Sequence, residues 1–539
     1  MSTSAFAPRA LPRRLPRPAR GLGPVAWQTL AGLLVAGVSA AFVIYLVHHL
    51  NLKGVAAGLV VAGSLWFLTT RNPQFGLVLV MLYLGLLDGY LKLASGSSLV
   101  TFVRDAFLWS LAIGLLLRAS VARQRLPLPP MTGWLVAFTI IVLVEFLNPN
   151  AGTIVHSIAG AREHLEFLPL FFLTYTFVRS VRALRMFCIL LALIAGANGI
   201  AGWIQFKESP AQFAAWGPGY SQRVLGTGEF AGAGRTGVTS SGQSTNRPFG
   251  LGSDAGDGGL FGMVALCGIL ALAAFSQRKR YQLFAVAMAL AAVLAIITSQ
   301  GKAVIVASVV TVLVFVVLAV SARNRLRSFT GLALAVVVAV FVVASVVGQV
   351  GSGGFRYSGL APSSIISTTN HERGFAFAAI PHNIVTFPFG VGLGTAGPAA
   401  GSSGASHLAL TQNLDAENEF AFLTLETGVP GMLVFIVFVV TLLFIGLSRV
   451  RHEPDRQARV LLAALIAPFA AVFVLFFVSA ASPSVPTGPY IFAVGGIISY
   501  WLITLPARRA RGARSAGLGS AVKQLASARP HAETQQGAT

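Results

Sequence analysis

Apolar runs of about 20 residues recur along this chain, and a run of that length can cross the hydrocarbon core of a bilayer as a helix. Hydrophobic residues make up 55% of the sequence and charged residues only 10%, which is more apolar surface than a soluble core of this size needs. We therefore predict an all-α, polytopic transmembrane helical bundle of about 12 to 14 spans, with two long extracytoplasmic loops.

The net charge of +22 could suggest a nucleic-acid partner, so the position of the charges relative to the apolar runs decides its meaning. If the N-terminus is cytoplasmic, the segments on that side of the predicted membrane hold 28 of the 39 Lys and Arg residues and only three of the 17 acids. This asymmetry follows the positive-inside rule. It predicts a multi-pass plasma-membrane protein with both termini in the cytoplasm and no nucleic-acid partner.

Apolar runs and loops divide the chain into seven predicted segments. They are a basic cytoplasmic tail (1–24), an N-terminal transmembrane bundle (25–205), a first long outer loop (206–257), central transmembrane helices (258–349), a second long outer loop (350–416), C-terminal transmembrane helices (417–505) and a basic, disordered cytoplasmic tail (506–539). The first outer loop is rich in Gly, Ser and Thr, so it is either a solvated linker or a functional loop. In the second, FAFAAIPHNIVTF predicts a short amphipathic helix at the membrane surface.

Four carboxylates lie at the start of one apolar run, in the stretch NLDAENEFAFLTLETGVPG. Helical spacing places Asp415, Glu419 and Glu426 on one face, where Asp415 and Glu419 would cap the helix or face solvent. Glu417 projects elsewhere and is either a catalytic base or a cap. Glu426 lies two turns into the helix, so it should be paired or functional. We expect it to orient the outer loop through a hydrogen bond.

Several other patterns are weak. Gly392, Gly394 and Gly397 match a GxGxxG spacing, but no strand precedes them, so a dinucleotide site is improbable. The nine histidines show no paired metal-binding spacing, and we expect neither a metal nor a cofactor. The neighbouring intramembrane charges Arg104 and Asp105 favour structural pairing.

Four stretches together resemble the family of bacterial O-antigen ligases and O-antigen or exopolysaccharide polymerases. They are AGAREHLEFLPLFFLTYTFV (159–178), NRPFGLGSDAGDGG (246–259), RGFAFAAIPHNIVTFPFGVGLG (373–394) and ENEFAFLTLETGVPG (417–431). The last matches the family's pattern of Asn, an aromatic residue, Glu and two glycines. Where the ligases commonly carry His before this Asn, the chain has Glu417, which favours polymerase-type members. Lys302, in TSQGKAV, takes the place of a common family arginine.

This resemblance implies a membrane glycosyltransferase of the bacterial plasma membrane that needs no metal. Its partners would be a polyprenyl-pyrophosphate-linked saccharide, a glycan acceptor, the lipid bilayer and other polysaccharide assembly proteins. A pyrophosphate leaving group needs fixed cations, which arginine supplies. Arg247 and Arg373 are the candidates, with Arg223 behind them, and a base at Glu417 would take the proton of the acceptor hydroxyl.

Further candidate substrate-binding residues are Arg162, Lys302, Asn418, Glu426, Gly392 and Gly394. Arg162 would bind lipid phosphate or simply extend to the interface, and the glycines would let the loop backbone approach a ligand or a helix closely. Two other functions stay open. One is a transporter or flippase for polysaccharide or lipid-linked saccharide, although no internal repeat is seen. The other is a cell-wall glycan polymerase.

Overall fold

The computed structural model describes residues 53–97, 100–124, 126–151, 153–227, 236–238, 244–319, 377–397 and 418–510. Nearly all of these residues belong to one compact unit that begins at Ala57. Helices dominate the unit, so the predicted all-α fold is confirmed. The start of the predicted N-terminal bundle, residues 25–52, and the end of the predicted central helices, residues 320–349, lie outside the described residues.

The elements of the first half are helices of very different lengths. They are α2 (Lys53–Thr69), α3 (Pro73–Leu82), the π-helix η1 (Tyr83–Leu87), α4 (Asp88–Ser95), α5 (Val100–Val121), α6 (Thr132–Val144), the 3-10 turn η2 (Glu145–Leu147), α7 (Ile154–Leu165), α8 (Leu168–Phe177) and α9 (Val181–Lys207).

The second half adds the remaining long helices and one small hairpin. Its elements are α10 (Pro210–Ala214), α11 (Pro218–Leu225), β1 (Thr236–Val238), β2 (Ser244–Asn246), α12 (Asp257–Phe275), α13 (Lys279–Thr298), α14 (Lys302–Ala319), α20 (Glu419–Arg449), the 3-10 turn η4 (Val450–His452), α21 (Arg456–Leu475), α22 (Thr487–Ile498) and the π-helix η5 (Ser499–Thr504). Strands β1 and β2 pair antiparallel, with Gly237 opposite Thr245.

In the part of the chain that is described, nine helical segments are long and apolar enough to cross a membrane. Two shorter apolar helices, Gly58–Thr69 and Thr132–Leu147, accompany them. The protein is a multi-pass membrane protein with a helical bundle.

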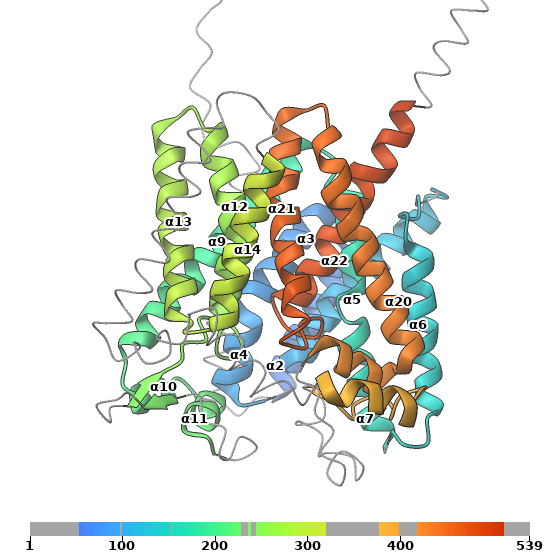
Figure 1. Cartoon of the computed structure of the whole chain (residues 1–539), viewed down its shortest axis with the longest axis vertical. Helices are drawn as coiled ribbons and strands as arrows, with labels where there is room; N and C mark the ends of the chain where they lie inside the picture. Colours follow the sequence, from blue (N-terminus) through green and yellow to red (C-terminus); the bar gives the residue numbers. More distant parts are fainter. Residues whose placement is uncertain are drawn as a thin grey trace, which may run out of the picture. The chain divides into compact units, whose positions relative to one another are not determined.

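The long helices run between two ends of the bundle (Figure 1). We call one the basic end; it holds the connections α2–α3, α5–α6, α12–α13 and α20–α21 and the C-terminal end of η5. The other, which we call the loop end, holds α7, α10, α11, the α13–α14 turn and the described part of the second long loop. Helices α12, α14, α20 and α22 all begin at the loop end.

Small residues let the central helices approach closely, as is usual in membrane bundles. A Cβ atom built on Gly199 of α9 would lie 2.1 Å from the carbonyl oxygen of Ala291 in α13. One built on Gly496 of α22 would lie 2.2 Å from the carbonyl oxygen of Phe171 in α8. A side chain at either position would therefore push these helices apart.

Both long loops contain regular structure. The first carries α10, α11 and the β1–β2 hairpin, so the alternative of a plain solvated linker is wrong for its described residues. In the second, residues 377–386 are helical, which confirms the predicted short helix there.

Candidate functional site

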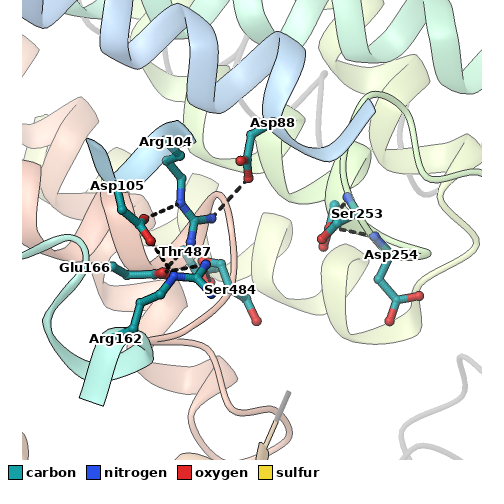
Figure 2. Close-up of polar contacts among 10 residues, drawn as sticks. Asp88, Arg104, Asp105, Arg162, Glu166, Ser253, Asp254, Ser484 and Thr487 are labelled. Atoms are coloured by element: carbon teal, nitrogen blue, oxygen red, sulfur yellow. Dashed lines mark hydrogen bonds and ion pairs between the residues drawn. The ribbon is translucent and has the colours of Figure 1, made fainter. Parts of the chain in front are cut away.

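A buried ion-pair network at the loop end centres on Arg104 of α5. Its guanidinium lies 3.1 Å from Asp88 Oδ2 and 3.1 Å from Asp105 Oδ1, and it also contacts Glu166. Only 6% of the Arg104 side chain is exposed. The expected pairing of Arg104 with Asp105 is confirmed, with two further carboxylates added. Figure 2 shows the guanidinium between these carboxylates.

The π-helix η1 brings Asp88 into this network. Its wider turn ends at Asp88, whose backbone N–H donates to the carbonyl oxygen of Tyr83, five residues earlier. A π-turn inserted in an α-helix shifts all later side chains around the axis, and such turns often mark functional sites. Here α4 begins at Asp88 and directs that carboxylate toward α5.

Arg162 of α7 is the second guanidinium of the network. Its Nε contacts Asp105, its Nη2 lies 3.3 Å from Glu166, and 21% of its side chain is exposed. Its guanidinium also lies 5.0 Å from the ring centroid of Phe102, which is 48% exposed. Arg162 therefore has a surface that a ligand can reach, whereas Arg104 has almost none.

Charges continue from the network into the first long loop. Asp88, Arg104, Arg162 and Arg223 all act electrostatically on Lys92 of α4. Arg223, on α11, pairs with Asp254 at 3.2 Å. Four basic side chains are thus grouped at the loop end together with the carboxylates that pair with them, and of the two guanidiniums in the network Arg162 is the one that an anionic ligand can reach.

Glu166 lies in the turn between α7 and α8, outside the helices that are long enough to span a membrane. Burial raises the pKa of Glu166 to about 7, although the charges of Arg104 and Arg162 oppose this shift. With Glu166 ionised the two guanidiniums face three carboxylates, and with Glu166 protonated the network is electrically balanced.

Two loops close against the network. A Cβ atom built on Gly89 would lie 2.6 Å from the backbone N of Ser253, so the turn before α12 lies directly against α4. One built on Gly488 would lie 2.8 Å from the ring of Phe167. Figure 2 shows Ser484 and Thr487, from the segment that begins α22, behind Arg162 and Glu166. The network therefore joins distant parts of the sequence.

A second polar cluster lies on another face of α7. His164 Nε2 is 3.0 Å from Glu426 Oε2, and Glu426 Oε1 accepts a hydrogen bond of 3.0 Å from the backbone N–H of Ala396. The His164 ring stacks on Phe422, with centroids 4.9 Å apart. Glu426 is fully buried, and it contacts the second long loop through Ala396.

The predicted glycines Gly392 and Gly394 lie in this loop, and both have positive φ angles, of 110° and 74°. A Cβ atom on Gly394 would lie 2.3 Å from the carbonyl oxygen of His156, and one on Gly392 would lie 2.7 Å from Ala151 Cβ. Their backbone therefore rests directly on α7 and on the turn before it. The expected close approach of this backbone to a helix is thus seen at Gly394.

The first turn of α20 differs from the sequence-based prediction. Asn418, not Asp415 or Glu419, is the N-cap, since its Oδ1 accepts from the backbone N–H of Ala421. Glu419 is buried rather than solvated, and its Oε2 accepts from the N–H groups of Ala481 and Ser482. Among the described residues, Asn418 Nδ2 and Glu419 Oε1 are buried with no hydrogen-bond partner.

The remaining predicted residues lie on other elements or outside the described residues. Arg247 follows β2 directly and is half-buried, and Lys302 is the first residue of α14. Arg373 and Glu417, the other two predicted catalytic residues, lie outside the described residues, as does Asp415. Glu417 is nevertheless joined covalently to Asn418 at the start of α20.

Sequence reasoning missed Asp88, Lys92, His164 and Glu166 as parts of the site. Asp88 and Lys92 were visible as charges inside an apolar run, which is a signal of function or pairing. His164 and Glu166 follow Arg162 in AGAREHLEF. Because His164 and Glu166 are two residues apart, they lie on nearly opposite faces of a helix.

No known protein family matches this sequence, and no similar curated protein was found. The chemistry of the site is therefore the basis for assigning a function.

Proposed function

We propose that the protein is a membrane glycosyltransferase of the O-antigen ligase and polymerase type, with polymerase favoured over ligase. It transfers a saccharide from a polyprenyl-pyrophosphate donor to a hydroxyl of a glycan acceptor at the outer face of the bacterial plasma membrane. The observation that carries this proposal is the partly exposed Arg162 within a group of basic residues at the loop end.

The donor's diphosphate carries several negative charges, and arginine binds such groups with a planar fork that stays protonated. Arg162 offers its guanidinium beside the exposed ring of Phe102, which would contact the apolar chain of a lipid-linked donor. The N-terminal ends of α12, α14, α20 and α22 also lie at the loop end. Their dipoles favour anions there.

The acceptor hydroxyl needs a base, and Glu417 is the proposed one. It would take the hydroxyl proton as the oxygen attacks the anomeric carbon of the donor sugar. The bond from that carbon to the phosphate oxygen breaks, and the diphosphate leaves with the electron pair. The helix that follows Glu417 contacts the helix of Arg162 through Glu426 and His164, and this contact supports a base near the donor cations.

Orientation follows from charge. Among the described residues, the connections at the basic end and the helix turns that flank them hold 12 Arg and Lys residues and only two acids, so that end faces the cytoplasm under the positive-inside rule. The loop end and its basic group then lie on the outer side, where lipid-linked saccharides meet growing surface glycans.

A flippase for lipid-linked saccharide is the second candidate. Ion pairs such as Arg104–Asp88 lie within apolar helices, and transporters also use intramembrane charges. The two functions differ in product, because a flippase moves its substrate without forming a glycosidic bond.

The test is purified protein in proteoliposomes with lipid-linked saccharide and no nucleotide sugar, metal or ion gradient. Mass analysis should show longer lipid-linked glycan from the wild type. Glu417→Gln and Arg247→Ala should abolish it, whereas Arg456→Ala at the basic end should not. Unchanged glycan length with the wild type, or full product from both Glu417→Gln and Arg247→Ala, would refute the proposal.

A further inference from the structure

Helix α7 connects the two polar clusters of the loop end. Arg162 and His164 are two residues apart, so on a helix they point to nearly opposite faces. Arg162 lies in the ion-pair network with Asp105, and His164 contacts Glu426 of α20. Whatever fixes the His164 face of this short helix therefore also fixes the direction of the Arg162 guanidinium.

The second long loop is joined to α20 through its backbone. The N–H of Val391 donates to the carbonyl oxygen of Leu425 at 2.6 Å, and the N–H of Val429 donates to that of Pro388 at 2.9 Å. Gly428 leaves helical geometry at this point, with φ 66° and ψ −177°, which frees the backbone groups that the loop uses. Residues 387–397, which we call the glycine loop, thus form one body with the start of α20.

Within the described residues, van der Waals contacts and a side-chain hydrogen bond join that body to α7. A Cβ atom on Gly160 would lie 2.2 Å from the backbone N of Gly394, so the two surfaces touch but share no hydrogen bond there. A polar connection to α7 is the His164–Glu426 pair, in which the second carboxylate oxygen accepts from Ala396 of the glycine loop. One carboxylate therefore bridges α7 and the loop. Asn148, in the turn before α7, also donates a hydrogen bond of 3.3 Å to the carbonyl oxygen of Gly390.

His164 cannot itself act as the base in this arrangement. Its side chain is only 1% exposed, its ring stacks on Phe422, and Phe138 meets it edge-on with centroids 5.8 Å apart. A group enclosed by two aromatic rings does not touch a substrate. It can hold its neighbours in place, and a hydrogen bond to a buried carboxylate is strong enough to do so.

We propose that His164 and Glu426 are positioning residues: the pair fixes the glycine loop against α7 and thereby aims Arg162 at the donor diphosphate. This inference rests on the proposed function for its kinetic consequence. Its structural consequence, a closed glycine loop, does not depend on any activity.

Closure can be measured with a reporter cysteine. Cys188 and Cys267 are both completely buried, so the wild type gives little background with a membrane-impermeant maleimide. Thr395 in the glycine loop is 1% exposed and differs little in size from cysteine. Thr395→Cys should react slowly. Adding His164→Ala or Glu426→Ala should speed labelling about 10- to 100-fold, the effect of losing a hydrogen bond to a charged group.

Conservative and distant variants separate positioning from general damage. His164→Gln keeps an N–H that can donate to Glu426, so it should restore slow labelling. Tyr490→Phe removes a different buried hydrogen bond, 2.7 Å to the carbonyl oxygen of Leu465, and should leave labelling of Thr395→Cys unchanged. Equal labelling of Thr395→Cys with and without His164→Ala would refute the proposed closure.

Kinetics then test the effect on Arg162. In correctly inserted protein, His164→Ala should raise the KM for lipid-linked saccharide about tenfold and change kcat less than about twofold. The reason is that the Arg162 guanidinium would no longer be held in the direction that binds the donor diphosphate. A loss of kcat alone, with KM unchanged, would refute the positioning role. If wild-type protein forms no glycan at all, the proposed function fails, while the labelling result still decides whether the pair closes the loop.

Discussion

Removing either guanidinium of the ion-pair network should have very different effects. Arg104→Met removes a buried cation that pairs with three carboxylates: Asp105 and Glu166 keep Arg162, but the buried Asp88 loses its guanidinium partner. Breaking a buried pair in this way costs about 3–5 kcal/mol, because uncompensated charge stays buried. Arg162→Met leaves Asp105 and Glu166 still bound to Arg104, so its cost should be about 1 kcal/mol. The two variants should therefore differ by roughly a hundredfold or more in folding equilibrium.

The assay is unfolding of purified protein in mixed micelles by increasing SDS, followed by tryptophan fluorescence. Arg104→Met should unfold at a clearly lower SDS fraction, and adding Glu166→Gln should recover part of the loss because one buried charge is removed with its partner. Arg162→Met should unfold close to the wild type yet lose glycan transfer. Equal destabilisation by Arg104→Met and Arg162→Met would refute the division into a structural and a ligand-facing arginine.

Further predictions concern packing, topology and the basic end. Gly160→Ala should destabilise the protein by about 1–3 kcal/mol in the same SDS titration, because its Cβ would lie 2.2 Å from Gly394 N, whereas Gly133→Ala, with no atom within 4 Å, should be neutral or stabilising. In intact cells an impermeant maleimide should label Ala211→Cys at the loop end and not Ala122→Cys at the basic end; the reverse pattern would overturn the orientation. Glu453→Gln should lower stability by less than about 1 kcal/mol, since its partner Arg509 is 45% exposed; a larger loss would mean that the pair is an essential anchor.

The helical bundle and its charge asymmetry were predictable because both depend on the average composition of long stretches of sequence. A span needs about 20 apolar residues, and the basic connections between spans can be recognised even when the span boundaries are wrong by a few residues. The same reasoning predicted the pairing of Arg104 with Asp105 and the short helix in the second loop, since both depend only on nearby residues.

Details that depend on one residue of register were not predictable in this way. The capping assignment failed because α20 begins at Glu419 with Asn418 as its N-cap, so Glu419 lies buried inside the first turn. The π-turn η1 lies directly before Asp88 and shifts the direction of this side chain around the helix axis, toward Arg104. No residue in YLGLL signals such a turn. The partner of Glu426 lies 262 residues away, and single-sequence spacing carries no information about such pairs.

Direct binding of an isoprenyl diphosphate is the measurement that tests the account most closely. Purified wild-type protein in detergent should bind farnesyl diphosphate more tightly than farnesyl monophosphate, measured by isothermal titration calorimetry. Arg162→Met should weaken diphosphate binding by at least about tenfold, the worth of one charge-assisted hydrogen bond, while Arg71→Met at the basic end leaves it unchanged. Equal affinity in the wild type and Arg162→Met, or a loss confined to Arg71→Met, would contradict a donor site at the loop end.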